Sequence, residues 1–208
     1  MKKKYLTIVG SGGHARMIIE CSIILGYEVK FIVDANSNSF SKEEILGISV
    51  KPKNYLKKIN KSTNIFFAIG DNFEREKFFN KYNNYFNFIN LIHPSSFIAH
   101  NVKIGQANFI GPKAIVNSAS YIKNNCIINS GSIIEHECKI MNHVHVGPGA
   151  IVCGRVKIEK NSFIGAGSKI IQNLTVKKNN IIGAGSVVLA NTSANSIYVG
   201  SPAKKKNN

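Results

Sequence analysis

The sequence lacks any long uninterrupted apolar segment. None of its 208 residues lies in a window of 18 consecutive apolar side chains, and the best candidate, MIIECSIILG, is broken by Glu20. A helix that spans a membrane needs about 20 such residues, so we expect no membrane span. The basic start, MKKK, is followed by an apolar run of only about five residues, too short for the core of a signal peptide. We therefore expect a cytoplasmic protein.

The sequence also has few cysteines and no CxxC pair. The four cysteines are Cys21, Cys126, Cys138 and Cys153. Paired or closely spaced cysteines are the usual mark of a disulfide framework or a zinc knuckle. Their absence favours reduced thiols.

Acidic residues are scarce, since 11 Asp and Glu stand against 27 Lys and Arg and give a formal net charge of +16. Such an excess can mark a nucleic-acid-binding protein. Here the lysines are scattered and form no basic stripe interleaved with aromatic residues, which argues against nucleic acid. The charge instead favours a small anionic substrate.

What the sequence does have is a period of six. Stepping by six from Ile98 to Val188 places Ile or Val at all sixteen positions. These positions are Ile98, Ile104, Ile110, Val116, Ile122, Ile128, Ile134, Ile140, Val146, Val152, Ile158, Ile164, Ile170, Val176, Ile182 and Val188. The residue two places earlier is usually Ser, Ala or Cys. Neither the 3.6 period of a helix nor the period of 2 of a strand explains this spacing.

A short strand, a tight corner and a repeat every six residues predict a parallel β-helix. The narrow interior of such a coil has room for one branched and one small side chain per strand. Gly and Asn at the corners supply the positive φ angles that tight turns require. This β-helix is expected over residues 93–190, after a junction at His93–Pro94, with residues 191–208 as a C-terminal tail in which Lys204 to Lys206 are solvated.

Residues 1–92 lack the period of six and alternate between strand and helix patterns. KYLTIV, EVKFIVD and NIFFAIGDN predict strands, whereas RMIIECSIILG and FEREKFFNKY predict helices. This alternation is typical of a Rossmann-like parallel sheet, so the fold class is an α/β N-terminal lobe followed by a parallel β-helix.

A glycine-rich turn, GSGGHA, follows the first predicted strand and matches GxGxxA, with Asp34 about twenty residues further on. In a dinucleotide-binding protein this turn holds phosphates at a helix N-terminus, and the acid binds a ribose hydroxyl. The same physics suits any nucleotide diphosphate. The β-helix behind the turn argues against a hydride-transfer enzyme.

The whole arrangement resembles the hexapeptide-repeat sugar acetyltransferases, a family that includes the UDP-bacillosamine-pathway N-acetyltransferase, perosamine N-acetyltransferases and sialic acid O-acetyltransferases. The segments NSGSIIEHEC, HVHVGPGA and VGSPAK carry the resemblance. It implies a left-handed prism with 18 residues per coil, a homotrimer, and acetyl-CoA as co-substrate without a metal. The implied reaction acetylates the amino group of a nucleotide-linked sugar, such as a UDP-4-amino-4,6-dideoxy sugar, for surface glycan synthesis.

The resemblance also assigns sites. The nucleotide sugar would be bound by Gly12, Gly13, His14, Asp34, Gly70 and Asn129. AIGDN carries Asp71 where the bacillosamine enzyme has Asn, so the sugar itself stays open. Contacts to acetyl-CoA would come from His145, Ala166 and Ala184.

The catalytic residues implied are His136, Glu137 and Gly154. Since Ile134 and Ile140 point inward, His136 and Glu137 lie at an outer corner, and Gly154 follows His136 by one coil of 18 residues. An imidazole near neutral pH can take the proton of an attacking amine. A neighbouring carboxylate orients it, and a backbone N–H can stabilise the thioester oxygen.

Three alternatives remain open. An O-acetyltransferase of sialic or other nonulosonic acids shares every motif, and a non-catalytic nucleotide-sugar-binding scaffold keeps the coil for assembly alone. A zinc site from Cys138, His143 and His145 is disfavoured because Cys138 occupies an inward position. We interpret Glu135 and His143 as surface residues.

Overall fold

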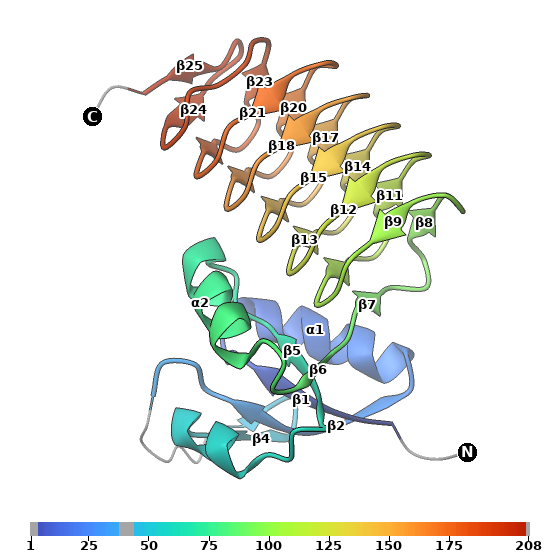
Figure 1. The fold of residues 1–208 in the computed structure, drawn as a ribbon, viewed down its shortest axis with the longest axis vertical. Helices are drawn as coiled ribbons and strands as arrows, with labels where there is room; N and C mark the ends of the chain where they lie inside the picture. Colours follow the sequence, from blue (N-terminus) through green and yellow to red (C-terminus); the bar gives the residue numbers. More distant parts are fainter. Residues whose placement is uncertain (1–3, 38–43, 207–208) are drawn as a thin grey trace. The chain divides into compact units, whose positions relative to one another are not determined.

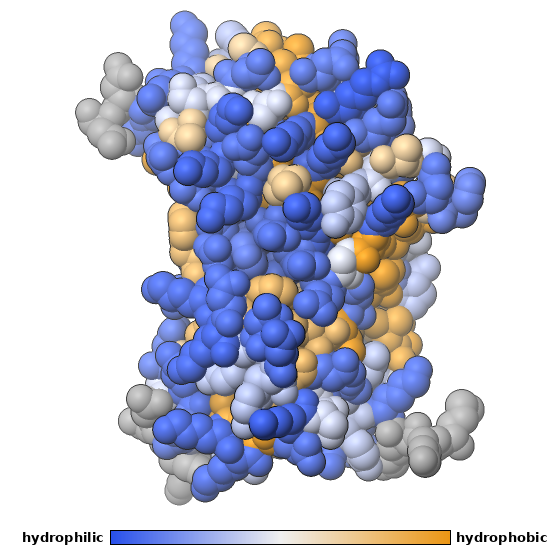
Figure 2. Space-filling view, viewed as in Figure 1, coloured by the Kyte–Doolittle hydropathy of each residue, from blue (hydrophilic) through white to orange (hydrophobic). Residues whose placement is uncertain are grey.

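A computed structural model describes residues 4–37 and 44–206. The chain forms two compact units, Met1–Leu91 and Ile92–Asn208. Within the described ranges, no helix combines the length and the apolar character needed to cross a bilayer. Figure 2 shows mainly hydrophilic side chains on the visible face, with smaller apolar patches between them.

The N-terminal unit contains a sheet of order β3-β4-β2-β1-β5-β6 (Figure 1). All neighbours in it are parallel except β3 and β4, which form an antiparallel pair. Its strands are β1 (Lys4–Val9), β2 (Tyr27–Val33), β3 (Glu44–Ile45), β4 (Ile48–Lys51), β5 (Asn64–Phe67) and β6 (Asn87–Phe88). Its helices are α1 (Gly13–Ile24), the 3₁₀ helix η1 (Lys53–Lys58) and α2 (Asn72–Tyr82).

Local sequence explains these elements. The central strand β1 buries Leu6, Ile8 and Val9, as expected for a strand covered on both faces. Helix α2 begins after Asp71, whose carboxylate accepts a hydrogen bond from the Glu74 N–H at 2.8 Å. The predicted Rossmann-like pattern is confirmed, and α1 begins at Gly13, earlier than predicted, because the turn already ends at Gly12.

The C-terminal unit is a parallel β-helix whose coils stack from green to red in Figure 1. From β8 to β23, paired strands are 18 residues apart, as in Phe109↔Ile127 and Ile133↔Ile151. The two-residue strands are β7 (Leu91–Ile92), β8 (Phe97–Ile98), β9 (Lys103–Ile104), β10 (Phe109–Ile110), β11 (Ile115–Val116), β12 (Tyr121–Ile122), β13 (Ile127–Ile128), β14 (Ile133–Ile134), β15 (Lys139–Ile140), β16 (His145–Val146), β17 (Ile151–Val152), β18 (Lys157–Ile158), β19 (Phe163–Ile164), β20 (Lys169–Ile170), β21 (Thr175–Val176), β22 (Ile181–Ile182) and β23 (Val187–Val188).

The core of this unit is the column of Ile and Val residues found every six positions. From Ile110 to Val188 these side chains are at most 2% exposed. Small side chains such as Ala114, Cys126 and Cys138 are buried beside them. The predicted pairing of one branched and one small inward residue is therefore confirmed.

The corners of the coil contain residues with positive φ. Glycine occupies them on one edge, for example Gly149 at 64° and Gly167 at 65°, and asparagine dominates another, for example Asn161 at 60°. On the third edge, Glu137 and Arg155 adopt this conformation at 60° and 61°. Corners of successive coils are joined by backbone hydrogen bonds, such as the 2.9 Å bond from Arg155 N–H to His136 C=O.

The segment expected as a C-terminal tail contains two further strands. β24 (Ile197–Val199) pairs in parallel with β22, and β25 (Lys204–Lys205) pairs antiparallel with β24. Tyr198 of β24 packs against the core of the β-helix, so this segment covers the end of the core. The lysines of β25 are exposed, but they lie in a strand.

Candidate active site

The glycine-rich turn of the N-terminal unit leads from β1 into α1. Gly10 has φ of 113°, and a Cβ there would lie 2.6 Å from the Ala68 carbonyl oxygen, so only glycine fits. Around Gly12 and Gly13 a Cβ would meet nothing within 4 Å, which leaves the backbone open to an incoming group. Neither a side-chain cap nor an acidic residue occupies the first turn of α1. Its N–H groups can therefore receive a phosphate.

Beside this turn lies a cavity of about 300 Å³. All the N-terminal residues predicted to bind the nucleotide sugar line it, namely Gly12, Gly13, His14, Asp34 and Gly70. Sequence reasoning did not assign Ser11, Asp71 and Glu74, which also line it. One Asp34 oxygen accepts the Asn36 N–H at 2.7 Å and holds the loop after β2.

Arg75 of α2 is buried and holds the loop that carries Gly70, one of the residues that line the cavity. Its guanidinium donates to the carbonyl oxygens of Ile69 at 3.0 Å and Gly70 at 3.1 Å, and to the Asn72 side chain at 2.8 Å. Burial, followed by the charge of Arg75, lowers the pKa of His14 from 6.5 to about 4. His14 is thus neutral at physiological pH and presents no cation to the cavity.

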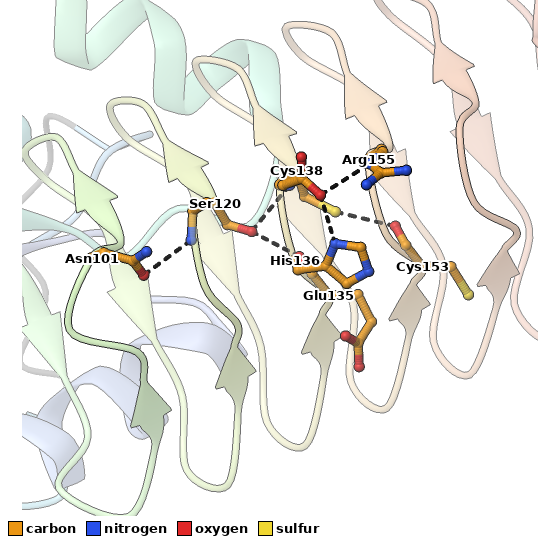
Figure 3. A network of polar contacts seen from close by, with 9 residues as sticks. Asn101, Ser120, Glu135, His136, Cys138, Cys153 and Arg155 are labelled. Carbon is orange, nitrogen blue, oxygen red and sulfur yellow. Dashed lines mark hydrogen bonds and ion pairs between the residues drawn. The ribbon is translucent and has the colours of Figure 1, made fainter.

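The second group of predicted residues lies at a corner of the β-helix, shown in Figure 3. The loop between β14 and β15 places the His136 side chain outside the coil, with half of it exposed. A Cβ on Gly154 would lie only 2.6 Å from His136 Nε2, so the imidazole occupies the space that this glycine leaves. The structure therefore brings together the three residues predicted as catalytic.

Glu137 fixes the orientation of this imidazole. Its Oε2 lies 3.0 Å from His136 Nδ1 and also accepts the Arg155 Nε–H at 2.9 Å. These two hydrogen bonds are the main reason that the pKa of Glu137 lies below its usual value. Because the ionised carboxylate only accepts, Nδ1 is the nitrogen that donates to it, and the neutral form of this imidazole has its lone pair on Nε2 beside Gly154.

The corner is connected to the neighbouring coils by a short series of hydrogen bonds visible in Figure 3. Ser120 donates to the Glu135 carbonyl oxygen at 2.7 Å and accepts the Cys138 N–H at 3.1 Å. The Cys138 thiol lies 3.1 Å from the Cys153 carbonyl oxygen of the next coil. These contacts fix the backbone on both sides of His136.

Two further predicted residues, Asn129 and His145, lie close together on another face of the coil. The Asn129 amide nitrogen is 3.3 Å from His145 Nε2, and the ring of Phe163 packs edge-on against His145 at 5.0 Å between centroids. Both predicted residues are largely buried. Ala166 and Ala184 lie on one corner edge, exposed and 18 residues apart, joined by the Gly185 N–H bond to Ala166 C=O at 2.8 Å.

The interpretation of His143 as a surface residue was wrong. It is 4% exposed and lies in the asparagine-rich corner edge, 2.8 Å from the Asn125 amide nitrogen through its Nδ1. Cys138 points into the core with no exposed surface. Among residues 4–37 and 44–206, no three His, Cys, Asp or Glu side chains form a group that could hold a metal.

Arg155 was not predicted, although one signal was available. It lies 18 residues after Glu137, the same spacing that places Gly154 over His136. Applying this spacing to every charged corner residue would have found the ion pair.

Comparisons with known proteins agree with both units. The PglD N-terminal domain family matches residues 5–82, and the bacterial transferase hexapeptide (six repeats) family matches residues 155–190. PerB from Caulobacter crescentus, solved with CoA and GDP-perosamine, is 32% identical, with a TM-score of 0.91 over 97% of each chain. A histidine-to-asparagine variant of this perosamine N-acetyltransferase, with the same ligands, is also similar (31% identity, 98% of this chain, 97% of that chain, TM-score 0.90).

Two more distant relatives extend the comparison. The acetyltransferase domain of PglB from Neisseria gonorrhoeae, in complex with acetyl coenzyme A, is 28% identical over 99% of this chain and 100% of that chain, with a TM-score of 0.88. Uncharacterized protein L142 of Acanthamoeba polyphaga mimivirus is 30% identical over 108 residues, which are 51% of this chain but only 21% of that protein.

A Rossmann-like lobe followed by a left-handed β-helix with a histidine–carboxylate corner defines the class of hexapeptide-repeat acyltransferases. PerB is more than 30% identical to this chain over nearly the whole length of both, so the family within this class can be stated. The chain belongs to the family of sugar N-acetyltransferases that contains the perosamine enzyme.

Proposed function

We propose that this protein transfers the acetyl group of acetyl-CoA to the amino group of a nucleotide-linked amino sugar, with His136 as the general base. The observation that carries the proposal is the imidazole itself. Its Nδ1 is hydrogen-bonded to Glu137 and its Nε2 faces Gly154. The side chain lies outside the coil and is half exposed. The similar perosamine enzyme, solved with CoA and GDP-perosamine, supports the choice of substrates.

In the proposed reaction, the neutral amine of the sugar attacks the carbonyl carbon of the thioester. His136 Nε2 takes the amine proton as the new C–N bond forms. No acceptor among the described residues takes the Gly154 N–H, so it can stabilise the negative charge that develops on the carbonyl oxygen. The C–S bond then breaks, and the imidazolium returns the proton to the CoA thiolate.

We assign the acceptor to the cavity of the N-terminal unit. Its glycine-rich turn suits the diphosphate, and Asp34 suits a ribose hydroxyl. The resemblance favours a UDP-4-amino-4,6-dideoxy sugar, whereas the perosamine enzyme was solved with a GDP sugar. Asn129, His145, Ala166 and Ala184 are proposed contacts to sugar and CoA, as the resemblance implies.

A CoA-release assay on a panel of UDP- and GDP-linked amino sugars and of nonulosonic acids, with product mass detection, tests the function. We expect an N-acetylated sugar, and a kcat for His136→Ala that is about 10²- to 10⁴-fold lower. His100→Ala is the matched control, because His100 lies at the same corner two coils earlier. Equal turnover by His136→Ala and the parent would refute the assigned base, and an O-acetylated product would favour the nonulosonic acid alternative.

A thermal-shift measurement with CoA distinguishes the enzyme from a non-catalytic scaffold. A ligand that binds only the folded state raises the melting temperature. We expect such a rise with CoA. A scaffold that binds nucleotide sugar alone would show the rise with the sugar and none with CoA.

We also propose that the chain forms a homotrimer through one face of its β-helix. The outward residues of the sheet β23-β20-β17-β14-β11-β8 are apolar at five of six positions. These residues are Phe97, Ile115, Ile133, Ile151 and Val187, with Lys169 as the exception. The sheet β21-β18-β15-β12-β9 instead presents lysines at three of its five outward positions. Phe97 is exposed and the other four apolar residues are partly exposed, and an apolar column of this kind favours contact with another copy of the chain.

A further inference from the structure

One side chain at the proposed catalytic corner has no role in the function stated above. Arg155 reaches back from the next coil, and its Nε donates to the same Glu137 oxygen that lies on His136 Nδ1. We propose that Arg155 is a positioning residue for His136, holding the Glu137 carboxylate so that the imidazole keeps Nδ1–H toward the carboxylate and Nε2 toward Gly154. This inference rests on the proposed function.

The backbone gives a first argument. Arg155 has φ of 61° and Glu137 has φ of 60°, the left-handed region that glycine and asparagine adopt most readily. A long charged side chain has no preference for the left-handed conformation. The backbone at residue 155 therefore does not explain why arginine stands there.

The exposure of the ion pair gives a second argument. The Arg155 side chain is 60% exposed and the Glu137 side chain is 46% exposed. Ion pairs this exposed add little to stability, because water screens them and both side chains lose freedom. The contact therefore orients the Glu137 carboxylate but contributes little to the free energy of folding. A variant of Arg155 should fold normally.

Charge gives a third argument. The titratable and charged side chains around the imidazole are Glu135, Glu137, Cys138, Cys153 and Arg155. Without the arginine, the two carboxylates of Glu135 and Glu137 flank His136 in sequence, and no other lysine or arginine of the described ranges pairs with Glu137. They would favour the imidazolium form, which has no lone pair on Nε2 and cannot act as a base. The positive charge of Arg155 offsets part of this negative charge.

A direct role is the competing explanation. An exposed guanidinium could instead bind an anionic group of a substrate. That role predicts a higher KM for one substrate with an unchanged tautomer of His136, whereas positioning predicts a lower kcat with KM nearly unchanged.

The test is an NMR measurement of the full chain with ¹⁵N-labelled histidine, in which His136→Gln identifies the signal of His136. The wild type should show Nδ1–H and an unprotonated Nε2 in the neutral form. Arg155→Ala should give mixed tautomers and a titration midpoint at higher pH, with an unchanged circular dichroism spectrum. Arg155→Gln, which keeps a donor without charge, should restore the tautomer but not the midpoint.

Lys157→Ala is the matched control, because it removes a nearby cation that pairs with Glu159 instead of Glu137. It should leave the His136 signal unchanged. An Arg155→Ala signal identical to the wild type overturns the proposal, and so does an equal change in Lys157→Ala.

Kinetics provides the second readout. Arg155→Ala should lower kcat about tenfold, with KM within twofold and the acid limb of the pH profile moved to higher pH. In the Glu137→Gln background, Arg155→Ala should lower kcat no further, because Arg155 acts through Glu137. A full additional loss in the double variant, or a change in KM alone, overturns positioning. If no acceptor reacts with the wild type while Arg155→Ala still changes the tautomer, the proposed function fails and the positioning role stands.

Discussion

At the residue scale, the corner that carries His136 depends on an absent side chain. The imidazole lies where the Cβ of residue 154 would be, at 2.6 Å from Nε2 and 2.7 Å from Cε1. Glycine is required here by this contact alone, since Gly154 does not have the positive φ that marks glycines such as Gly149. An alanine can therefore adopt the backbone but must displace the histidine.

We expect Gly154→Ala to lower kcat about 10²-fold with little change in melting temperature. A misplacement of a catalytic group by about 1 Å has a cost of this order. Steady-state kinetics and differential scanning fluorimetry measure the two effects. Gln172→Ala, at the same corner of the following coil, is the control, and an active Gly154→Ala would show that the contact has no catalytic importance.

His14 makes the stability of the N-terminal unit depend on pH. The unfolded chain binds a proton on His14 below pH 6.5, whereas the folded chain keeps it neutral down to about pH 4. The stability that this histidine contributes is therefore present above pH 6.5 and is lost as the pH falls toward 4.

Between pH 7 and pH 5 this loss amounts to at most about 2 kcal/mol. We expect His14→Gln, which cannot take up a proton, to lose less stability over the same interval. Urea unfolding followed by circular dichroism at both pH values measures the difference. Equal losses in the two proteins would contradict the pKa shift.

At the element scale, each coil strand has one inward and one outward residue, and in strands such as β15, β20 and β22 their burial differs sharply. In β22, Ile182 is fully buried, whereas its neighbour Ile181 is 46% exposed. We expect Ile182→Ala to cost about 2–5 kcal/mol, because it leaves a cavity in the core. Ile181→Ala should cost less than about 1 kcal/mol. Thermal unfolding of both variants tests this, and similar losses would mean that the period of six does not define the core.

The sequence predicted the regular elements better than the short ones. The hexads predicted strands such as β19 and β22, because burial imposes the same choice at each coil. The strand pair β24–β25 was missed, since β25 contains two lysines and has no apolar pattern. The hairpin of β3 and β4 was also missed, because these strands have only two and four residues and are not part of a repeat that would reveal them.

At the scale of the whole molecule, the apolar column of Phe97, Ile115, Ile133, Ile151 and Val187 should decide the oligomeric state. We expect the wild type to sediment as a trimer and Ile133→Glu to sediment as a monomer, because a charge in an apolar contact cannot be solvated. Tyr121→Glu, at an outward position of the lysine-bearing sheet, is the control and should remain trimeric. A wild-type monomer would refute the proposed assembly.

From the sequence alone, the β-helix, the Rossmann-like lobe and five residues of the N-terminal cavity could be predicted, whereas Ser11, Asp71 and Glu74 of that cavity were missed. Repeated burial leaves a periodic trace in the sequence, and tight turns leave glycines. The repeat of 18 residues relates Arg155 to Glu137, but three features required the folded structure: the hydrogen bond of Arg155 to the carboxylate, the effect of Arg75 on His14, and the burial of His143. These contacts join side chains from different coils or from helix and turn, and their pairing depends on distances in space that local sequence does not encode.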